Sequence, residues 1–230
     1  NLSHENIFPL INIIEDERYI NLTKHDCLVS FLPFYHFYAF ALHLSSITAS
    51  SKITVMERFV PDTYLKLIEQ QHATKLFVVP SVLLFLVKNE IVNQFSLSSI
   101  KSIFVAGAPL GTDLYKEAIT RFQVPIRQIY GSTETGGICA VQDVGCKCES
   151  VGGLIPNLSC KVLDLSNHKS VGPSHIGELC FKGVNVMKGY YNNETATRNT
   201  FEEDGFYRTG DVGYYNDEGN FFIVDRVKDL

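Results

Sequence analysis

The sequence predicts an α/β fold in which a parallel sheet with flanking helices (residues ~1–138) precedes a mostly antiparallel β subdomain (residues ~139–228). Two observations lead to this prediction. Strand-like and helix-like segments alternate through the first part, whereas after about residue 138 glycine and proline become frequent and helical periodicity is lost. A chain of 230 residues is long enough for one large domain or two small ones with a substantial buried core.

The alternation in the first part predicts a parallel sheet. Short runs rich in β-branched and aromatic residues are typical of buried strands, and they fall at 27–32, 52–57, 75–79, 102–106 and 124–129. Longer amphipathic runs separate them and indicate helices at 36–49, 61–72, 80–90 and 111–122. Pro61 and Pro80 stand where a first helical turn would begin, a position that proline favours. Strands and helices that alternate with short connections form right-handed βαβ units, which require parallel strands.

The second part contains short strand-like runs without helical periodicity. The segments SCKVLDL, GELCFKG, FYRTGDVGYY and NFFIVDR have the composition of strands. The tetrapeptide NDEG (216–219) separates the last two and is a typical hairpin turn. We therefore expect antiparallel pairing here.

Composition excludes several classes of protein. A hydrophobic content of 45% and a charged content of 20% are those of an ordinary globular protein rather than a disordered one. The net charge of −5, without a Lys/Arg cluster, argues against nucleic-acid binding. The longest apolar run (76–87) is too short to span a bilayer and is interrupted by Pro80, so we expect no transmembrane segment.

The cysteines and the opening segment favour an intracellular location. The six cysteines are scattered, and without a C-x-x-C pair a metal site at Cys139, Cys146 and Cys148 is disfavoured. Reduced thiols are the better interpretation. The opening segment NLSHENIFPL does not have the character of a signal peptide.

Three unusual loops follow predicted strands. LPFYHFY (32–38), VAGAPLG (105–111) and YGSTETGG (130–137) each come directly after a strand of the expected parallel sheet. In open parallel sheets ligands bind in the crevice beyond the carboxyl ends of the strands. The three loops together therefore predict one ligand site.

The segment YGSTETGG has the residues of a phosphate-binding loop. Its glycines allow positive φ and close approach of the backbone to a ligand, and its hydroxyls can donate to phosphate oxygens; these residues are Gly131, Ser132, Thr133, Thr135, Gly136 and Gly137. Glu134 supplies a hard anionic oxygen suited to Mg²⁺, and Tyr130 supplies a flat face for a base. The spacing of Gly131 and Gly136 is that of a P-loop, but Gly137 and Ile138 stand where that motif needs Lys and Ser/Thr. A plain strand–helix turn is the alternative.

A second cluster of polar residues lies near the end of the sequence. Asp211, between Gly210 and Gly213, is suited to accept hydrogen bonds from both hydroxyls of a ribose, and Arg226 supplies a cation for a sugar or phosphate. The alternative is that Asp211 only caps a turn and that Arg226 pairs with Asp225.

These motifs together resemble those of a known family. YGSTETGG, YRTGDVGYYNDEGNFFIVDRVKDL, LPFYHFYAF and AGAPL, in this order and spacing, resemble the adenylate-forming (AMP-binding) superfamily, and within it the 4-coumarate–CoA ligase and firefly-luciferase branch. The resemblance covers essentially the whole chain. It implies activation of a carboxylic acid by ATP to an acyl-adenylate, followed by transfer to a thiol, usually coenzyme A. The implied cofactors are ATP and Mg²⁺, with coenzyme A as co-substrate.

The resemblance implies roles for residues at the nucleotide. Tyr130 would stack on adenine, opposite a wall formed by Gly107, Ala108 and Pro109. Thr133 would contact the phosphate of AMP and Glu134 would hold Mg²⁺, while the ribose would be bound by Asp211 with Arg226 beside it. Further nucleotide contacts are implied for Gln128, Gly131 and Ser132.

Other residues are implied at the acyl group and at a hinge. His36 would face the reacting carboxylate and, with Thr133 and Glu134, is a catalytic candidate; the alternative for His36 is a hydrogen-bonded interior histidine. The acyl pocket would include Tyr38, Ile129 and Gly137. Lys228 falls at the family's hinge between its large domain and a small C-terminal lid domain.

This sequence also departs from the family pattern. The family's phosphate loop would precede NLSHENI and its C-terminal domain would follow VDRVKDL, so we expect this chain to represent the second half of the large domain. Ile129 stands where the branch usually has glycine. Three functions fit: an aryl- or fatty-acid–CoA ligase, an adenylation domain that feeds a carrier protein, and a non-catalytic paralogue. The expected location is cytoplasmic or peroxisomal.

Overall fold

The computed structural model describes residues 1–147 and 149–229. The chain forms two compact units, which are described separately. One, here called the α/β unit, comprises Ile11–Ile129 and Asp143–Glu149, and the other, the β-rich unit, comprises Asn1–Leu10, Tyr130–Gln142 and Ser150–Leu230. The chain passes between the units at residue 130 rather than at the expected 138, and its first ten residues belong with the β-rich unit.

The α/β unit contains the predicted parallel strands. β3 (Lys75–Val78), β4 (Ser102–Val105) and β5 (Ile126–Tyr130) pair in parallel in that order. β1 (Cys27–Ser30) and β2 (Lys52–Val55) also pair in parallel, but they form a sheet of their own. The prediction of parallel strands is thus confirmed, with the five strands divided between two sheets. β1 is buried throughout and β3 and β4 nearly so, as expected for strands covered on both faces.

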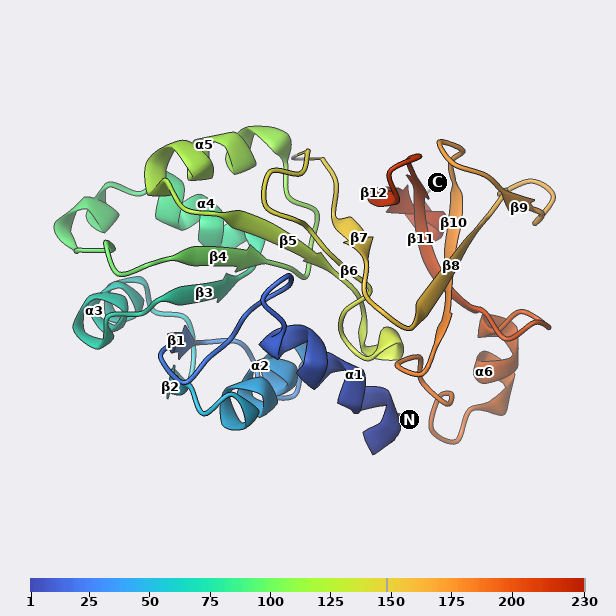
Figure 1. Cartoon of the computed structure of the whole chain (residues 1–230), viewed down its shortest axis with the longest axis horizontal. Coiled ribbons are helices and arrows are strands. Elements are labelled where there is room, and N and C mark those ends of the chain that lie inside the picture. Colours follow the sequence, from blue (N-terminus) through green and yellow to red (C-terminus); the bar gives the residue numbers. More distant parts are fainter. Residues whose placement is uncertain (148, 230) are drawn as a thin grey trace. The chain divides into compact units, whose positions relative to one another are not determined.

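Helices connect these strands as predicted. They are α2 (Phe37–Thr48), α3 (Pro61–Gln71), α4 (Pro80–Lys88) and α5 (Thr112–Phe122), with a short 3₁₀ helix η1 (Glu90–Gln94) after α4. Pro61 and Pro80 begin α3 and α4, where their missing N–H groups are not needed. α4 and α5 lie side by side along one face of the β3–β4–β5 sheet (Figure 1). Tyr64 of α3 is fully buried in the core, where its ring meets Phe31 edge-on.

Two helices were not expected from the sequence. α1 (His4–Glu15) contains Pro9, which obscures its helical pattern. α6 (Glu194–Thr200) contradicts the expectation that no helix follows residue 138. It buries none of its residues and so has no periodic apolar face. Its start is fixed locally, because the Asn193 side chain accepts a hydrogen bond from the Ala196 N–H (2.9 Å).

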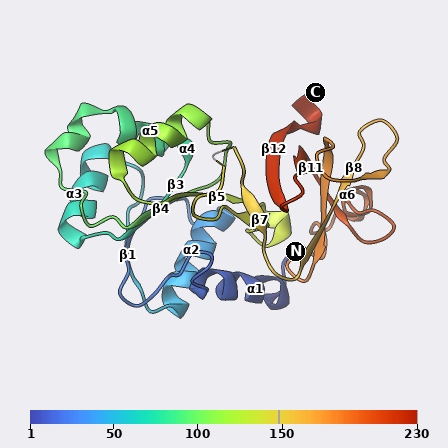
Figure 2. The ribbon, with the colours of Figure 1, turned by 45° about the horizontal axis from the view of Figure 1, so that its top comes forward.

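The β-rich unit contains the antiparallel strands that the sequence predicts. Its strand order is β6-β7-β12-β11-β10-β8-β9, and all neighbours are antiparallel. β11 and β12 lie side by side in Figure 2. Their bounds are β6 (Ala140–Val141), β7 (Gly152–Leu154), β8 (Leu158–Leu163), β9 (Ser170–Val171), β10 (Gly177–Gly183), β11 (Tyr207–Tyr215) and β12 (Asn220–Arg226). The predicted hairpin turn is confirmed: the Asn216 side chain accepts hydrogen bonds from the N–H groups of Glu218 (3.1 Å) and Asn220 (2.9 Å).

The structure also bears on the predictions about membrane spans and cysteines. No described helix has the length and apolar character needed to cross a bilayer. The described cysteines, Cys27, Cys139, Cys146, Cys160 and Cys180, are all free thiols, and Cys148 lies outside the described residues.

A buried ion pair joins β3 to the segment before β1. Asp26, which is 5% exposed, accepts hydrogen bonds from the Lys75 ammonium (2.8 Å) and the Thr74 hydroxyl (2.7 Å). It also accepts one from the Thr23 N–H (2.9 Å). Burial raises the pKa of the Asp26 carboxyl, but the hydrogen bonds from Lys75, Thr74 and Thr23 outweigh this effect, so the pKa lies below its usual range.

We expect Asp26→Asn to lower the free energy of unfolding at neutral pH by about 1.5–3 kcal/mol, because a charge-assisted bond to Lys75 is lost. Because the folded-state pKa is depressed, Asp26 stabilises the fold above its unfolded-state pKa, and this contribution disappears as the pH falls through the folded-state value. Urea unfolding of both proteins from pH 7 down to pH 3 measures the difference. The control is Glu117→Gln, which breaks an exposed pair with Lys88 and should cost less than about 1 kcal/mol. Equal costs for the two variants at pH 7 would contradict the role of Asp26.

Candidate functional site

The loop after β5 is compact and internally hydrogen-bonded. A 3₁₀ helix, η2 (Thr133–Thr135), follows Ser132, whose N–H donates to the Thr135 hydroxyl (3.0 Å). Gly136 and Gly137 have φ values of +65° and +99°, which other residues rarely adopt. The Thr135 side chain is buried in this cap, so the expectation that its hydroxyl is available to a phosphate is wrong. The exposed hydroxyl of the loop belongs to Thr133.

Position 131 requires glycine because there is no room for a side chain, and not because its φ is positive. A Cβ atom at this position would lie 2.2 Å from the carbonyl oxygen of Gly137. The first and last parts of the loop therefore touch through backbone atoms. This close approach takes place within the loop itself. The expected close approach of the loop backbone to a ligand stays a prediction.

In the part of the chain that the structure describes, the Glu134 carboxylate accepts one hydrogen bond. Its Oε1 accepts a hydrogen bond from the Tyr190 hydroxyl (3.1 Å), and its backbone oxygen accepts one from the Met187 N–H (2.7 Å). Burial and the neighbouring Glu134 charge raise the pKa of Tyr190, so the phenol stays a neutral donor. The second carboxylate oxygen of Glu134 has room for a further ligand.

Asp211 joins β5, β11 and β12. Its Oδ2 accepts a hydrogen bond from the Tyr130 hydroxyl (2.7 Å), and its Oδ1 lies 3.0 Å from Nε of Arg226, the residue opposite it on β12. Burial, and then the Asp211 charge, raise the pKa of Tyr130, which keeps that phenol protonated. Among the described residues, the Asp225 carboxylate accepts a hydrogen bond from the backbone N–H of Arg226 (2.8 Å) and none from its guanidinium group. The alternative in which Arg226 pairs with Asp225 is therefore wrong for the guanidinium group.

A cavity of about 430 Å³ brings four of the predicted residues together. Its volume is that of a small-molecule site. Its lining comprises Ser132, Glu134, Glu178, Tyr190, Asn199, Thr200, Tyr207, Arg208, Thr209, Gly210, Asp211 and Arg226. The predicted members are Ser132, Glu134, Asp211 and Arg226. A hydroxyl, two carboxylates and a guanidinium thus face one space, which suits a polar ligand that has both phosphate and hydroxyl groups.

Sequence reasoning missed several residues that line this cavity. Arg208 and Thr209 stand just before Asp211 in the same motif, so their position was a usable signal. The signal for Glu178 was weaker: it is an acidic residue in the otherwise apolar strand GELCFKG. Tyr190 lies in a loop far along the chain from Glu134, and no pattern connected the two.

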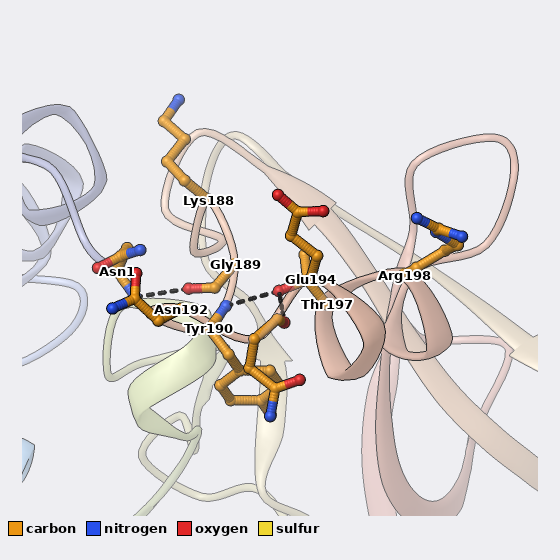
Figure 3. A pocket seen from close by; sticks show the side chains of 9 residues that line it. Asn1, Lys188, Gly189, Tyr190, Asn192, Glu194, Thr197 and Arg198 are labelled. Carbon is orange, nitrogen blue, oxygen red and sulfur yellow. Dashed lines mark hydrogen bonds between the residues drawn. The ribbon is translucent and has the colours of Figure 1, made fainter.

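The loop that carries Tyr190 is anchored to α6. The Tyr190 N–H donates to the Thr197 hydroxyl (2.9 Å), which in turn donates to the backbone oxygen of Asn193 (2.9 Å). A second cavity, of about 420 Å³, lies along this loop, with Lys188 and Arg198 at its rim. The Tyr190 ring and the Lys188 side chain point to opposite sides of the loop (Figure 3). The anchor thus fixes the segment from which Tyr190 reaches Glu134.

The remaining predicted residues belong to the α/β unit, except Lys228. His36 is exposed and caps α2, since its Nδ1 accepts a hydrogen bond from the Tyr38 N–H (3.1 Å), so the alternative of an interior histidine is wrong. The buried Tyr38 hydroxyl has no partner in the described part of the chain. Gly107 (φ +89°), Ala108 and Pro109 form an exposed turn after β4, and Gln128 and Ile129 are buried in β5. Lys228 lies exposed in η3 (Val227–Asp229). That all three loops build one site stays a prediction.

The carboxylates near the cavity would suit a magnesium ion that takes most of its ligands from a bound phosphate compound. Among residues 1–147 and 149–229, no three His, Cys, Asp or Glu side chains converge on a metal-sized site. Mg²⁺ commonly uses one or two carboxylates and takes its other ligands from phosphates and water. Glu134 supplies one such carboxylate at the edge of the cavity.

The family is established by comparison with known proteins. A family model described as "AMP-binding enzyme" matches residues 1–191, and the chain therefore belongs to the AMP-binding enzyme family. It is 38% identical over 234 residues to a probable 4-coumarate–CoA ligase 1 of Dictyostelium discoideum, and 35% identical over 232 residues to a luciferin 4-monooxygenase of Nipponoluciola cruciata. Both matches cover 100% of this chain and 42% of the relative.

Solved structures agree with this assignment. ATP-bound MatB from Rhodopseudomonas palustris matches with a TM-score of 0.91 and 29% identity, over 100% of this chain and 45% of that one. The resemblance to adenylate-forming enzymes predicted from the sequence is confirmed. The chain spans less than half the length of these relatives.

We expect Gly131→Ala to destabilise the protein by about 1–3 kcal/mol, because the new Cβ would overlap the Gly137 carbonyl group. The control is Gly172→Ala in the same unit, where a Cβ meets nothing within 4 Å. Urea unfolding should give a change within about 0.5 kcal/mol for that control. Similar values for the two variants would contradict the tight loop closure.

Proposed function

We propose that this chain is part of an enzyme that uses ATP to activate a carboxylic acid and then forms a thioester with coenzyme A. The observation that carries the proposal is the 430 Å³ cavity, where Ser132, Glu134, Asp211 and Arg226 face one space. The family membership and the ATP in the MatB structure support it.

Asp211 is arranged to bind the ribose. A carboxylate offers about four lone-pair positions, and Tyr130 and Arg226 occupy one each. Accepting positions are therefore left for the two hydroxyls of a ribose. Tyr130 and Arg226 hold the carboxylate in one orientation, which reduces the entropy lost when the sugar binds.

The other end of the cavity suits phosphates. Ser132 presents a hydroxyl donor to the cavity, and Glu134 presents the carboxylate for Mg²⁺. Thr133, between them in the loop, carries an exposed hydroxyl. Bound Mg²⁺ would neutralise charge on the phosphate oxygens as the carboxylate attacks. The Tyr190 hydroxyl holds one oxygen of Glu134 (3.1 Å) and leaves the other for the ion.

The proposed reaction needs no covalent bond to the protein. The substrate carboxylate oxygen bonds to the α-phosphorus of ATP while the bond to the β-phosphate oxygen breaks, which releases pyrophosphate. The thiol of coenzyme A then loses its proton to solvent and its sulfur bonds to the acyl carbon. The bond between the acyl carbon and the phosphate oxygen breaks, and AMP leaves with that electron pair. Positioning and electrostatic stabilisation of the pentavalent transition state supply the rate, so polar residues such as Asp211 and Glu134 matter more than a nucleophile.

The test is acid-dependent ATP–pyrophosphate exchange by the full-length protein that contains this chain. We expect Asp211→Asn to raise KM for ATP roughly tenfold to a hundredfold, because an amide is a weaker acceptor and loses the pairing with Arg226. The control is Asp225→Asn on the neighbouring strand, which has the same change of charge and should retain the wild-type KM. Exchange by no acid in the wild-type protein would contradict the proposed function.

A second prediction concerns acyl choice and depends on Ile129, which is 9% exposed in β5, one residue before Tyr130. We propose that its β-branched side chain fills space that a glycine would leave for a flat aromatic acid. Overpacking of a fitted pocket costs about 1–3 kcal/mol, roughly tenfold to a hundredfold in discrimination. Ile129→Gly should therefore raise kcat/KM for 4-coumarate relative to a medium-chain fatty acid. An unchanged ratio, or a wild-type preference for 4-coumarate, would contradict this role of Ile129.

A further inference from the structure

The pairing of β10 with β11 is interrupted just before Asp211. Glu178 is opposite Val212 and Cys180 is opposite Arg208, so residues 209–211 of β11 face the single residue Leu179 of β10. Such a bulge bends the strand and turns its side chains away from their regular directions. Asp211 is the last residue of this bulge, and its side-chain direction therefore depends on the conformation of the bulge.

One buried carboxylate contacts both the bulge and the residue before it. Glu178 is 4% exposed, and its Oε2 accepts hydrogen bonds from Nε (2.9 Å) and Nη2 (2.6 Å) of Arg208. Its Oε1 accepts one from the N–H of Gly210 (3.1 Å). Arg208 precedes the bulge and Gly210 lies within it. A single charged group thus fixes the backbone on the approach to Asp211.

The rest of the bulge is also hydrogen-bonded. The Thr209 hydroxyl donates to the carbonyl oxygen of Leu179 (2.8 Å) and accepts from the N–H of Asp211 (2.9 Å). Gly210 has a φ of +72°, which permits the sharp change of direction. Glu178 and Thr209 are therefore two supports of the same bulge, one through charge and one through a hydroxyl.

We propose that Glu178 is a positioning residue, which holds the bulge and so directs the Asp211 carboxylate toward a ribose diol. The inference rests on the proposed function. Glu178 acts through Asp211, because hydrogen bonds from Arg208 and Gly210 use about three of the four accepting positions of its own carboxylate. A structural ion pair alone would lower stability without changing how the protein distinguishes one sugar from another.

The test compares ATP with 2′-deoxy-ATP, which lacks one of the two hydroxyls. Dissociation constants for both are measured by calorimetry on the full-length protein. The wild-type protein should prefer ATP. In Glu178→Gln the amide oxygen can accept a hydrogen bond from Gly210 or from Arg208, but not from both sides, because the amide NH₂ group is a donor. We expect ATP affinity to fall about tenfold and 2′-deoxy-ATP affinity to fall less, so that the preference for ATP shrinks at least about threefold.

The matched control is Glu202→Gln. Glu202 also faces the Arg208 guanidinium, with Oε1 3.7 Å from Nε, but it makes no side-chain contact with the bulge. This variant should keep the wild-type preference. Thr209→Val removes the second support while it preserves side-chain shape, and it should reduce the preference in the same direction as Glu178→Gln. If circular dichroism shows that Glu178→Gln is unfolded, Thr209→Val provides the test instead.

The outcomes separate the two proposals. A wild-type protein that prefers ATP, with the same preference in folded Glu178→Gln and in Thr209→Val, would overturn the role of Glu178 and leave the proposed function in place. A wild-type protein that does not bind ATP would overturn the proposed function and this inference with it. A reduced preference in Glu178→Gln and Thr209→Val, but not in Glu202→Gln, would support the inference.

Discussion

The charge on Asp211 is the constraint on which the arrangement of the site depends. A half-buried carboxylate is costly unless its oxygens are satisfied, and here the Tyr130 hydroxyl and the Arg226 guanidinium satisfy it from two different strands. The group therefore connects the end of β5 with β11 and β12. Because each partner occupies only part of the carboxylate, the same interaction that stabilises these strands leaves accepting positions that face the cavity.

Irregular backbone brings these groups together. Regular pairing would direct alternate residues of β11 to opposite faces of the sheet, whereas the bulge at residues 209–211 changes this alternation next to Asp211. A second register shift, between Val212 and Gly213 in the pairing with β12, follows immediately. The loop after β5 is also irregular, because Gly131 and Gly137 make a backbone contact that excludes side chains. The cavity is therefore built where the sheet departs from regular geometry.

Much of the fold and part of the site could be predicted from the sequence. The β-branched runs and the alternation of strands and helices predicted the strands of the α/β unit, and residue chemistry alone indicated Glu134 and Asp211. α6 was missed because it has no buried face, and Thr135 was misjudged because the cap that uses its hydroxyl is visible only in three dimensions. Glu178 could not have been assigned a role, since its contacts depend on the strand register.

Two acids that line the cavity, Glu134 and Asp211, share one mode of support. Glu134 and Asp211 each accept a hydrogen bond from a tyrosine, Tyr190 and Tyr130 respectively, whose pKa is raised by burial and by the acid's own charge. A neutral phenol orients a carboxylate but does not cancel its charge as an ammonium group would. The Tyr190 hydroxyl thereby orients the Glu134 carboxylate, and the Tyr130 hydroxyl orients that of Asp211 while leaving accepting positions on it. In this site the two tyrosines supply direction, and Arg226 supplies the opposite charge for Asp211.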